Sequence, residues 1–324
     1  MPLPPNIKNA MPTPVQSTVE VESVSIASSV NVFVPQVWLI TDCSSALGQE
    51  LAIKTLLKGH YVAAACKVET ISSVIELLKP KFGDRVLVLD MDPRNKPLCQ
   101  SSLARLLMRW KRLDIVVNCS LKSIVGTVEE VSDWHIREQY ESSFYGPVNV
   151  ITSVLPVLRK QKSGHILCVT GITGHMGTPS LGLLTSAAHA LEGYAEALAF
   201  EVAPYNVKVT VVQPSLEAAV LANPIIFAFQ QEHYKNTVSA TVRSLLSCQE
   251  LSPELLVRNV VFAILSVAGI DNPPGRIVAG AEAIVQTKDK LRTVSEELED
   301  MLEVSYAADA EPLTEQQRRG LSGM

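Results

Sequence analysis

The chain has 324 residues, of which 28 are lysine or arginine and 33 are aspartate or glutamate, giving a formal net charge of -5 at pH 7. This mild acidity excludes the concentrated positive charge by which proteins typically bind nucleic acid, so we expect no nucleic-acid partner. Hydrophobic residues make up 47% of the chain. A chain of this length and composition can bury a large core, which excludes a wholly disordered protein.

The two ends of the chain differ in composition from the middle. Residues 1–34 combine proline, serine, threonine and valine without helical periodicity and predict a flexible leader, while residues 307–324 predict a polar tail. The uncharged run from Ser23 to Thr41 is as long as a membrane span, but its four serines, asparagine, glutamine and proline argue against a transmembrane helix. No basic segment precedes an apolar one at the start, so we expect no secretory signal and a cytoplasmic location.

Short apolar runs alternate with longer amphipathic segments from residue 37 onward. The apolar runs predict strands at 37–41, 61–65, 86–90, 114–118, 165–170, 207–212 and 276–279, and the amphipathic segments predict helices at 47–58, 70–79, 97–111, 133–160 and 182–203. Runs such as DIVVN and VKVTVV are nearly continuous in branched apolar residues, as in parallel sheets that helices cover on both faces. We therefore expect one α/β domain over residues 35–306, a Rossmann-type doubly wound parallel sheet with a helical substrate lobe. A further amphipathic helix is expected in KDKLRTVSEELEDMLEV.

Ligands of a doubly wound sheet bind beyond the carboxyl ends of its strands. Five loops should meet there, at residues 41–46, 66–67, 90–92, 118–121 and 170–174. Cys43, Cys66, Cys119 and Cys168 fall at or beside the same edge, which raises a thiol or metal site as one alternative. The six cysteines of the chain lack paired spacing, which favours buried fillers, and we expect no metal.

Several motifs between residues 36 and 305 occur in the order of one enzyme family. ITDCSSALGQELA resembles the turn Thr-Gly-x-x-x-Gly-x-Gly, VLVLDMD resembles the strand whose final aspartate contacts adenine, and LDIVVNCS resembles the strand that ends in Asn-Asn-Ala-Gly. Downstream, VTGITG and GLLTSAAHALEG resemble an active-site strand and helix. The chain is thus similar to the classical short-chain dehydrogenases and reductases, in their hydroxysteroid-dehydrogenase-like or ketoreductase-like branch. The resemblance implies a Rossmann fold, a nicotinamide cofactor, an oligomer and hydride transfer as the activity of the family.

The chain departs from this family at its catalytic positions. The family's catalytic asparagine, serine, tyrosine and lysine fall at Ser143, Gly171, Leu184 and Ala188. Leucine has no proton to donate and alanine carries no charge, and the loss of a general acid alone typically costs about 100-fold to 10,000-fold in rate. We therefore expect no classical hydride transfer, and the catalytic residues stay unknown. His175 and Thr170 are candidate substitutes, His175 because histidine as a residue type can act as an acid or base near neutral pH, although a solvated loop histidine is the simpler interpretation.

The cofactor turn differs from the family pattern as well. Asp42 and Ala46 stand at two of its glycine positions, and Leu121 replaces a glycine of the Asn-Asn-Ala-Gly loop. A carboxylate so close to a pyrophosphate would repel it by ~1 kcal/mol even in a high dielectric. The positions that still carry residues suited to a cofactor are Thr41, Ser44, Gly48, Lys67, Asp90 and Asn118, with Lys67 where NADP-preferring members carry a basic residue. We therefore expect no dinucleotide or only weak NADP binding, with full NADP binding as the alternative.

Three functions remain open. The first is a degenerate family member that binds a hydrophobic small molecule in a biosynthetic pathway, such as a secondary-metabolite pathway, and assists a non-redox step; the apolar segment 216–247 supports a ligand lobe. The second is a non-catalytic scaffold subunit in a homo- or hetero-oligomer with an active relative, paired through the helices at 133–160 and 182–203. The third is an NADP(H)-dependent oxidoreductase that uses displaced residues. Whether the chain is an enzyme therefore stays open.

Overall fold

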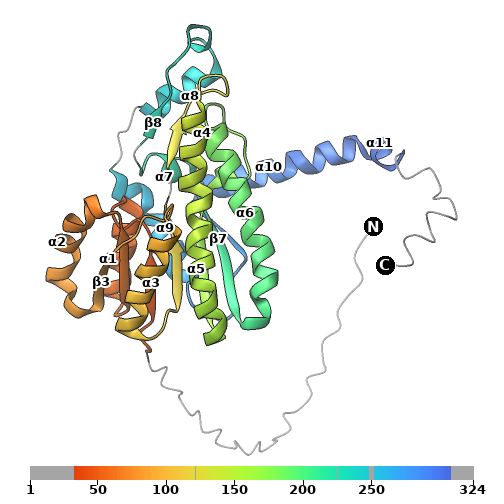
Figure 1. Cartoon of the computed structure of the whole chain (residues 1–324). Helices are drawn as coiled ribbons and strands as arrows, with labels where there is room; N and C mark the ends of the chain where they lie inside the picture. The colour runs from red at the N-terminus through yellow and green to blue at the C-terminus, as the bar shows by residue number, and fades with distance from the viewer. Residues whose placement is uncertain (1–32, 121, 224, 248–251, 308–324) are drawn as a thin grey trace, which may run out of the picture. The chain divides into compact units, whose positions relative to one another are not determined.

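A parallel sheet forms the centre of the fold (Figure 1). In the computed structural model, which describes residues 33–120, 122–223, 225–247 and 252–307, seven strands pair in the order β3-β2-β1-β4-β6-β7-β9. The strands are β1 Val37–Ile40, β2 Tyr61–Cys66, β3 Val86–Asp90, β4 Ile115–Asn118, β6 Gly164–Val169, β7 Val207–Pro214 and β9 Arg276–Ala279. Each lies at a predicted position, so the predicted Rossmann-type doubly wound fold is confirmed. Most of the predicted leader and tail, at residues 1–32 and 308–324, lies outside the described residues.

Helices cover both faces of this sheet. On one face pack α1 Ala46–Leu57, α2 Ile71–Phe82 and α9 Pro253–Val267, and on the other pack α3 Lys96–Trp110, α5 Gly146–Gln161 and α6 Gly182–Val202. Alternate side chains of β1 enter the two layers, Trp38 and Ile40 on one face and Val37 and Leu39 on the other. A strand that is buried on both faces has no polar side, which is why the sequence VWLI shows no alternation.

A smaller lobe follows the carboxyl ends of the central strands. Within the described part of the chain it contains a two-stranded parallel sheet, β5 Ser123–Val125 with β8 Ile225–Phe227, and the helices α7 Leu216–Val220 and α8 Val238–Ser247. Its core is an apolar cluster of buried residues, Val125, Leu181, Leu184, Val220 and Leu246, which we call the lobe cluster. The predicted helical lobe is therefore present, but it also contains two short strands that no sequence pattern indicated.

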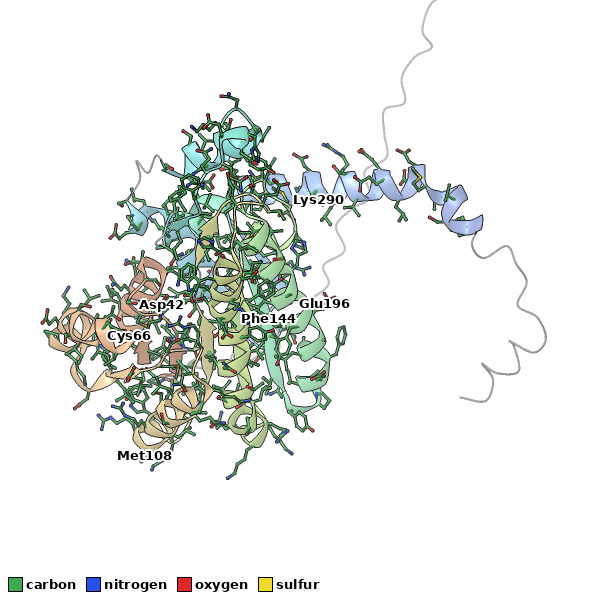
Figure 2. All side chains as sticks on the ribbon, turned by 45° about the horizontal axis from the view of Figure 1, so that its top comes forward. Asp42, Cys66, Met108, Phe144, Glu196 and Lys290 are labelled. Atoms are coloured by element: carbon green, nitrogen blue, oxygen red, sulfur yellow. The ribbon has the colours of Figure 1, made fainter. Side chains whose placement is uncertain are left out.

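The helix predicted over 133–160 is interrupted. α4 Asp133–Tyr140 is followed by a π-helical turn at Glu141–Tyr145 and then by α5. Phe144 of this turn, which is labelled in Figure 2, packs edge-on against Tyr194 of α6, since their ring centroids lie 6.3 Å apart with an interplanar angle of 87°. Such turns widen a helix locally and often occur near functional sites, and this one contains Ser143.

The remaining elements are short turns and the carboxyl-terminal helices. Short 3-10 turns occur at Val68–Thr70, Gly83–Arg85, Ile172–Gly174, Ala203–Tyr205 and Glu232–Tyr234. After β9 come α10 Ala281–Asp300 and α11 Leu302–Ala307, where an amphipathic helix was expected. Across the described ranges, none of the helices combines the length and the apolar character that a membrane crossing requires.

One aspartate, through its side chain and its backbone, joins the amino ends of three central strands. Asp114 precedes β4, and its Oδ2 accepts a hydrogen bond from the backbone N of Val37 at 2.7 Å. Its backbone carbonyl accepts another from the backbone N of His165 at 2.9 Å. Arg112 Nη2 lies 2.7 Å from Asp114 Oδ1, and the Asp114 side chain is only 11% exposed. The hydrogen bond from the Val37 amide to the carboxylate is therefore charge-assisted and lies at the buried side of Asp114, whereas Arg112 is half-exposed.

Replacing Asp114 by alanine should lower the free energy of unfolding by about 1–3 kcal/mol, because the amide of Val37 loses its acceptor. Urea denaturation followed by circular dichroism measures the change. Asp84→Ala is the matched control, since the Asp84 side chain is 96% exposed and pairs with Arg109 at the surface. Its removal should leave stability almost unchanged. Equal effects of the two substitutions would contradict the role assigned to Asp114.

Candidate functional site

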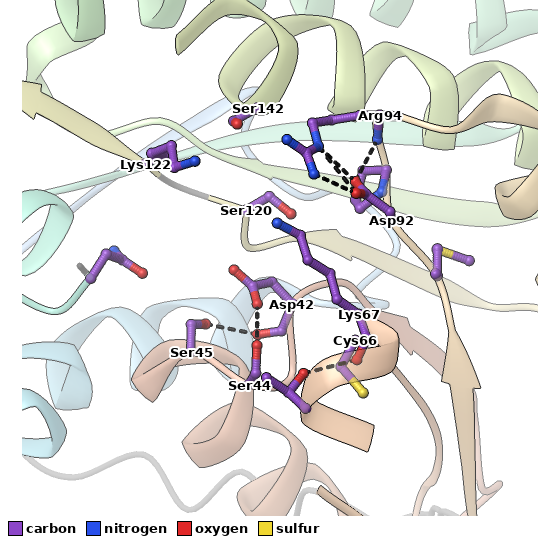
Figure 3. Close-up of a pocket in the computed structure, with 14 residues that line it drawn as sticks. Asp42, Ser44, Ser45, Cys66, Lys67, Asp92, Arg94, Ser120, Lys122 and Ser142 are labelled. Atoms are coloured by element: carbon purple, nitrogen blue, oxygen red, sulfur yellow. Dashed lines mark hydrogen bonds and ion pairs between the residues drawn. The ribbon is translucent and has the colours of Figure 1, made fainter. Parts of the chain in front are cut away.

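A cavity of about 380 Å³ lies where the loops after the strands converge (Figure 3). Four of the five predicted loops line it, through Asp42, Ser44, Ser45, Cys66, Lys67, Met91, Asp92 and Ser120, and the other lining residues are Thr70, Pro93, Arg94, Lys122, Ser142 and Asn223. Residues 170–174 do not belong to the lining. The structure thus brings four predicted loops to one site and leaves the fifth outside it.

The turn from β1 to α1 accommodates an aspartate in a left-handed backbone conformation. Asp42 has a φ of 52°, which aspartate tolerates better than most residues. Ser45 caps α1, since its Oγ accepts a hydrogen bond from the backbone N of Gly48 at 3.1 Å and donates one to the carbonyl of Asp42 at 2.8 Å. A Cβ at position 48 would lie 2.3 Å from that carbonyl oxygen. The close approach of α1 to the turn therefore requires glycine at position 48.

Both serine hydroxyls of the turn are already engaged. The sequence predicts Ser44 as a cofactor contact, whereas in the structure its Oγ donates to Asp42 Oδ1 at 2.7 Å and holds the carboxylate in the turn (Figure 3). Enclosure raises the pKa of Asp42, and the hydrogen bond from Ser44 and the charge of Lys67 oppose the rise. A phosphate approaching this turn would meet a carboxylate instead of free hydroxyl donors.

Carboxylates neutralise two of the cations that line the cavity. Arg94 Nη2 lies 2.7 Å from Asp92 Oδ2, and Arg94 Nη1 lies 3.2 Å from Glu138 Oε1. Lys122 also pairs with Glu138. Burial alone would raise the pKa of Asp92, but the hydrogen bonds and charge of Arg94 outweigh it and hold the pKa below its usual range. Lys67 also lines the cavity, and among the described residues no carboxylate lies within ion-pair distance of it, but its positive charge acts on both Asp42 and Asp92.

The other predicted cofactor residues hold strand ends and do not line the cavity. Thr41 is buried, and its Oγ1 accepts a hydrogen bond from the backbone N of Cys119 at 2.9 Å, which links β1 to the end of β4. Asp90 is half-buried at the end of β3, and Asn118 is buried at the end of β4. Leu121 lies outside the described residues. These residues shape the edge of the sheet rather than the surface of the cavity.

A family model described as short chain dehydrogenase matches residues 36–225. The chain belongs to the short-chain dehydrogenase/reductase family. It is 31% identical over 278 residues to Oxidoreductase BOA17 of Botryotinia fuckeliana, across 84% of this chain and 99% of that protein. A short-chain dehydrogenase structure from Streptomyces avermitilis has a TM-score of 0.76 at 25% identity, over 85% of this chain and 99% of that one. A Burkholderia cenocepacia short chain dehydrogenase in complex with NADP has a TM-score of 0.58, over 86% and 98%, and at 21% identity shows the fold alone.

The four positions at which the resemblance places the family's catalytic groups do not line the cavity. Leu184 is 1% exposed within the lobe cluster, and Ala188 is buried one turn further along α6. Ser143 is buried in the π-helical turn, where its Oγ accepts a hydrogen bond from Gln139 Nε2 at 2.7 Å. Gly171 has a φ of 99°. None of these four side chains is an ionisable group, in contrast to the family's tyrosine and lysine.

A buried carboxylate, which no sequence pattern singled out, engages Thr170 and lies near His175. Glu192 Oε1 accepts a hydrogen bond from Thr170 Oγ1 at 2.7 Å, and Gln213 Nε2 donates to both carboxylate oxygens at 2.8 and 2.9 Å. Arg276 Nη2 lies 3.5 Å and His175 Nε2 4.0 Å from Glu192 Oε2. Thr170 and His175 therefore belong to a network beside the turn after β6, and neither lines the cavity.

The spacing of Glu192 from Leu184 and Ala188 in the sequence indicates that its carboxylate is buried in such a network. Glu192 follows Leu184 and Ala188 at intervals of four residues, which places all three on one face of α6. A carboxylate on a buried helix face needs hydrogen-bond donors, so neighbouring polar side chains must converge on it. A Cβ at position 174 would lie 1.8 Å from Glu192 Oε1, which explains the glycine there.

The cysteines at the sheet edge are buried fillers. All five cysteines in the described ranges, Cys43, Cys66, Cys99, Cys119 and Cys168, are buried and unpaired. Burial raises the pKa of Cys99 to about 11 and that of Cys168 to about 12, so these thiols stay protonated at neutral pH. A group of three His, Cys, Asp or Glu side chains that could hold a metal does not occur among the described residues.

Gly171→Ala should lower the free energy of unfolding by about 1–3 kcal/mol, because a φ of 99° strains any side chain and the new Cβ would lie 2.9 Å from the Cβ of Ala219. A serine at this position would meet the same strain. Gly193→Ala is the control, since Gly193 is an exposed position of α6 and nothing outside the helix lies within 4 Å of the added Cβ. It should raise stability by about 0.5–1 kcal/mol through helix propensity. Similar stabilities of the two variants in urea would contradict the strain at position 171.

Asp42→Asn should make the protein more stable at neutral pH. The folded state raises the pKa of Asp42 above 3.8, so it binds the proton more tightly than the unfolded chain does. The free energy of unfolding therefore falls as pH rises from 3.8 through the folded-state pKa, and asparagine removes this contribution. Asparagine also tolerates the left-handed φ and can accept the hydrogen bond from Ser44.

Urea midpoints of wild type and Asp42→Asn measured from pH 3 to 8 test this prediction. The stability gain should be present at neutral pH and shrink toward zero at the acidic end. Ser44→Ala removes the hydrogen bond that opposes the rise in pKa, so it should steepen the pH dependence while Asp42 is present. Parallel curves for wild type and Asp42→Asn would show that Asp42 ionises as freely in the folded state as in the unfolded chain.

Proposed function

We propose that this member of the family binds a small molecule in the cavity and does not carry out the family's hydride transfer. The observation that carries the proposal is the environment of Leu184, which stands at the family's tyrosine position and is enclosed by the lobe cluster. Reduction of a carbonyl needs a proton donor beside the developing alkoxide. A leucine surrounded by apolar side chains supplies no proton. Ala188 likewise offers no cation to the site.

The ligand that fits this proposal is a hydrophobic metabolite with a polar end, as an intermediate of a biosynthetic pathway can be. Lys67, the lining cation without an ion pair in the described chain, supports the polar end. Asn223 lines the cavity and lies just after α7. Val220 of α7 belongs to the lobe cluster, so the cavity borders the lobe. This position supports a ligand whose apolar part points toward the lobe. By holding one conformation of such an intermediate, the protein would assist a non-redox step such as a cyclisation or an isomerisation.

The charges of Lys67 and Asp42 determine the affinity that we expect for a dinucleotide. A neighbour in fold was solved with NADP, and the unpaired Lys67 supports a preference for NADP over NAD in this chain. The turn opposes the pyrophosphate, because the Asp42 carboxylate is fixed there by Ser44 and repels a phosphate. The residues of this turn therefore fit a pyrophosphate poorly, and we propose weak NADP binding without a redox role.

A titration with NADP and NAD by isothermal calorimetry tests the proposed site. NADP should bind weakly, but more tightly than NAD. Lys67→Ala should weaken the binding of NADP by about fivefold and leave the binding of NAD unchanged, because an ion pair at a partly exposed site contributes about 1 kcal/mol. Asp42→Asn should strengthen both by a similar factor, since it removes a repulsion of ~1 kcal/mol. Lys160→Ala, at an exposed position on α5, is the control and should change neither affinity.

The absence of hydride transfer is tested separately from binding. Purified protein with NADPH and a panel of ketones should show no turnover at any pH. Turnover would overturn the central claim even if the cofactor bound as described. Tight binding of both dinucleotides, with no effect of Asp42→Asn, would instead overturn only the argument from the turn.

Two alternative functions each have one supporting observation. A scaffold role is supported by exposed aromatic side chains on the helices predicted to pair, Tyr145 just before α5 and Phe200 on α6. If the protein is a scaffold, it should co-purify with a catalytically intact relative. An NADP(H)-dependent oxidoreductase with displaced residues is supported by the name of the relative BOA17 and by Ser142 and Lys122 in the lining. Ketone turnover that disappears in Lys122→Ala would favour that alternative over the function proposed above.

A further inference from the structure

Helix α10 carries an apolar stripe that no described element covers. Its first two turns pack on the body of the domain, where Ala283 and Thr287 are buried. Beyond these turns α10 extends away from the central sheet (Figure 1). From 291 to 300 every residue is exposed, including Leu291 at 61% and Leu298 at 60%. An isolated helical segment of this length is marginal in water, and its stability normally comes from a partner on its apolar face. Among the residues that the structure describes, no element supplies such a partner to residues 291–300.

The stripe has the spacing of a paired helix. Its members follow one another at alternating intervals of three and four residues: Ile284, Thr287, Leu291, Val294, Leu298 and Met301. This is the a and d pattern by which two helices place one apolar seam against another. The buried Thr287 shows that the seam starts against the body of the domain and continues beyond it without cover.

Charge is segregated along α10 from residue 288 to residue 300. Lys288, Lys290 and Arg292 occupy its first half, with Asp289, and the second half carries Glu296, Glu297, Glu299 and Asp300. This order opposes the helix macrodipole, which favours anions near the amino end and cations near the carboxyl end. Ion pairs of Arg292 with Asp289 and Glu296 neutralise only part of it. The arrangement therefore does not serve the stability of α10 alone.

We propose that α10 pairs with α10 of a second copy of this chain, in antiparallel orientation. An antiparallel pair sets the basic half of each helix against the acidic half of the other, whereas a parallel pair sets like charges side by side. In this pairing Leu291 of one copy lies opposite Val294 of the other. Lys290 of each copy then flanks the seam beside Glu297 of the other copy, so the two-fold axis generates two such ion pairs. The acidic half argues against a membrane as the occupant, because anionic lipid surfaces repel it.

Sedimentation velocity of the full-length chain over a range of concentrations tests this pairing, since it follows association whatever other contacts the chain makes. Leu291→Gln should abolish the association step. Lys290→Glu and Glu297→Lys should each weaken it by about tenfold, because two attractions become two repulsions. The double variant K290E/E297K should restore it, because the pairs re-form with exchanged signs. Glu299→Lys carries the same charge change outside the seam and without a described ion pair, and should have little effect.

The outcomes separate the possible occupants. Weakening by each single exchange with recovery in the double variant supports an antiparallel second copy. Equal weakening by Glu297→Lys and Glu299→Lys, or no recovery in the double variant, overturns it. The proposal is also overturned if wild type and Leu291→Gln both sediment as the same single species at all concentrations. Flotation with phosphatidylcholine and phosphatidylserine vesicles that depends on Leu291, without any change in solution association, assigns the stripe to lipid and also overturns the proposal.

Discussion

The turn between β1 and α1 is the constraint on which the candidate site depends. β1 lies between β2 and β4, and the turn is bonded to both neighbours, since Cys43 N donates to Ala65 O at 2.8 Å and Thr41 Oγ1 accepts from Cys119 N. Inside the turn, the carbonyl of Asp42 is approached so closely by the start of α1 that only glycine fits at position 48. The path of the backbone is therefore set by the sheet and the helix together. A side chain at position 42 can change the chemistry of the turn without changing its shape.

The same separation of shape from chemistry occurs on α6. Leu184 and Ala188 are buried among apolar groups, so they contribute burial of apolar surface where a tyrosine and a lysine would need hydrogen-bond and charge partners. Catalytic groups held in such places generally cost stability, and apolar residues remove that cost. Glu192 on the same face is different, because donors from three other segments converge on it. Its loss would leave those donors unsatisfied, which is a structural reason for a carboxylate independent of catalysis.

The central sheet could be predicted from the sequence because each of its strands is a buried apolar run between amphipathic helices. The short strands β5 and β8 could not, since Ser123 pairs with Ile225 across about a hundred residues and three residues contain no periodicity. The loops at the cavity were predictable from the topology of the sheet. Which way their side chains point was not: Ser44 was expected to face a phosphate and bonds Asp42 instead. The ion pairs of Glu138 with Arg94 and Lys122 join separate segments of the chain, so no local sequence pattern predicts them.

The balance of charge around the cavity limits what can bind there. Asp42, Asp92 and Glu138 stand against Lys67, Arg94 and Lys122, and the pairs formed by Arg94 and Lys122 leave only Lys67 to meet an anion. A pyrophosphate brings at least two negative charges to a turn that already holds the Asp42 carboxylate, so one cation cannot balance it. The three carboxylates and the three cations already balance, so a ligand with one polar or singly charged end adds less unbalanced charge than a pyrophosphate does. The charges around the cavity therefore constrain a ligand separately from the fold of the sheet.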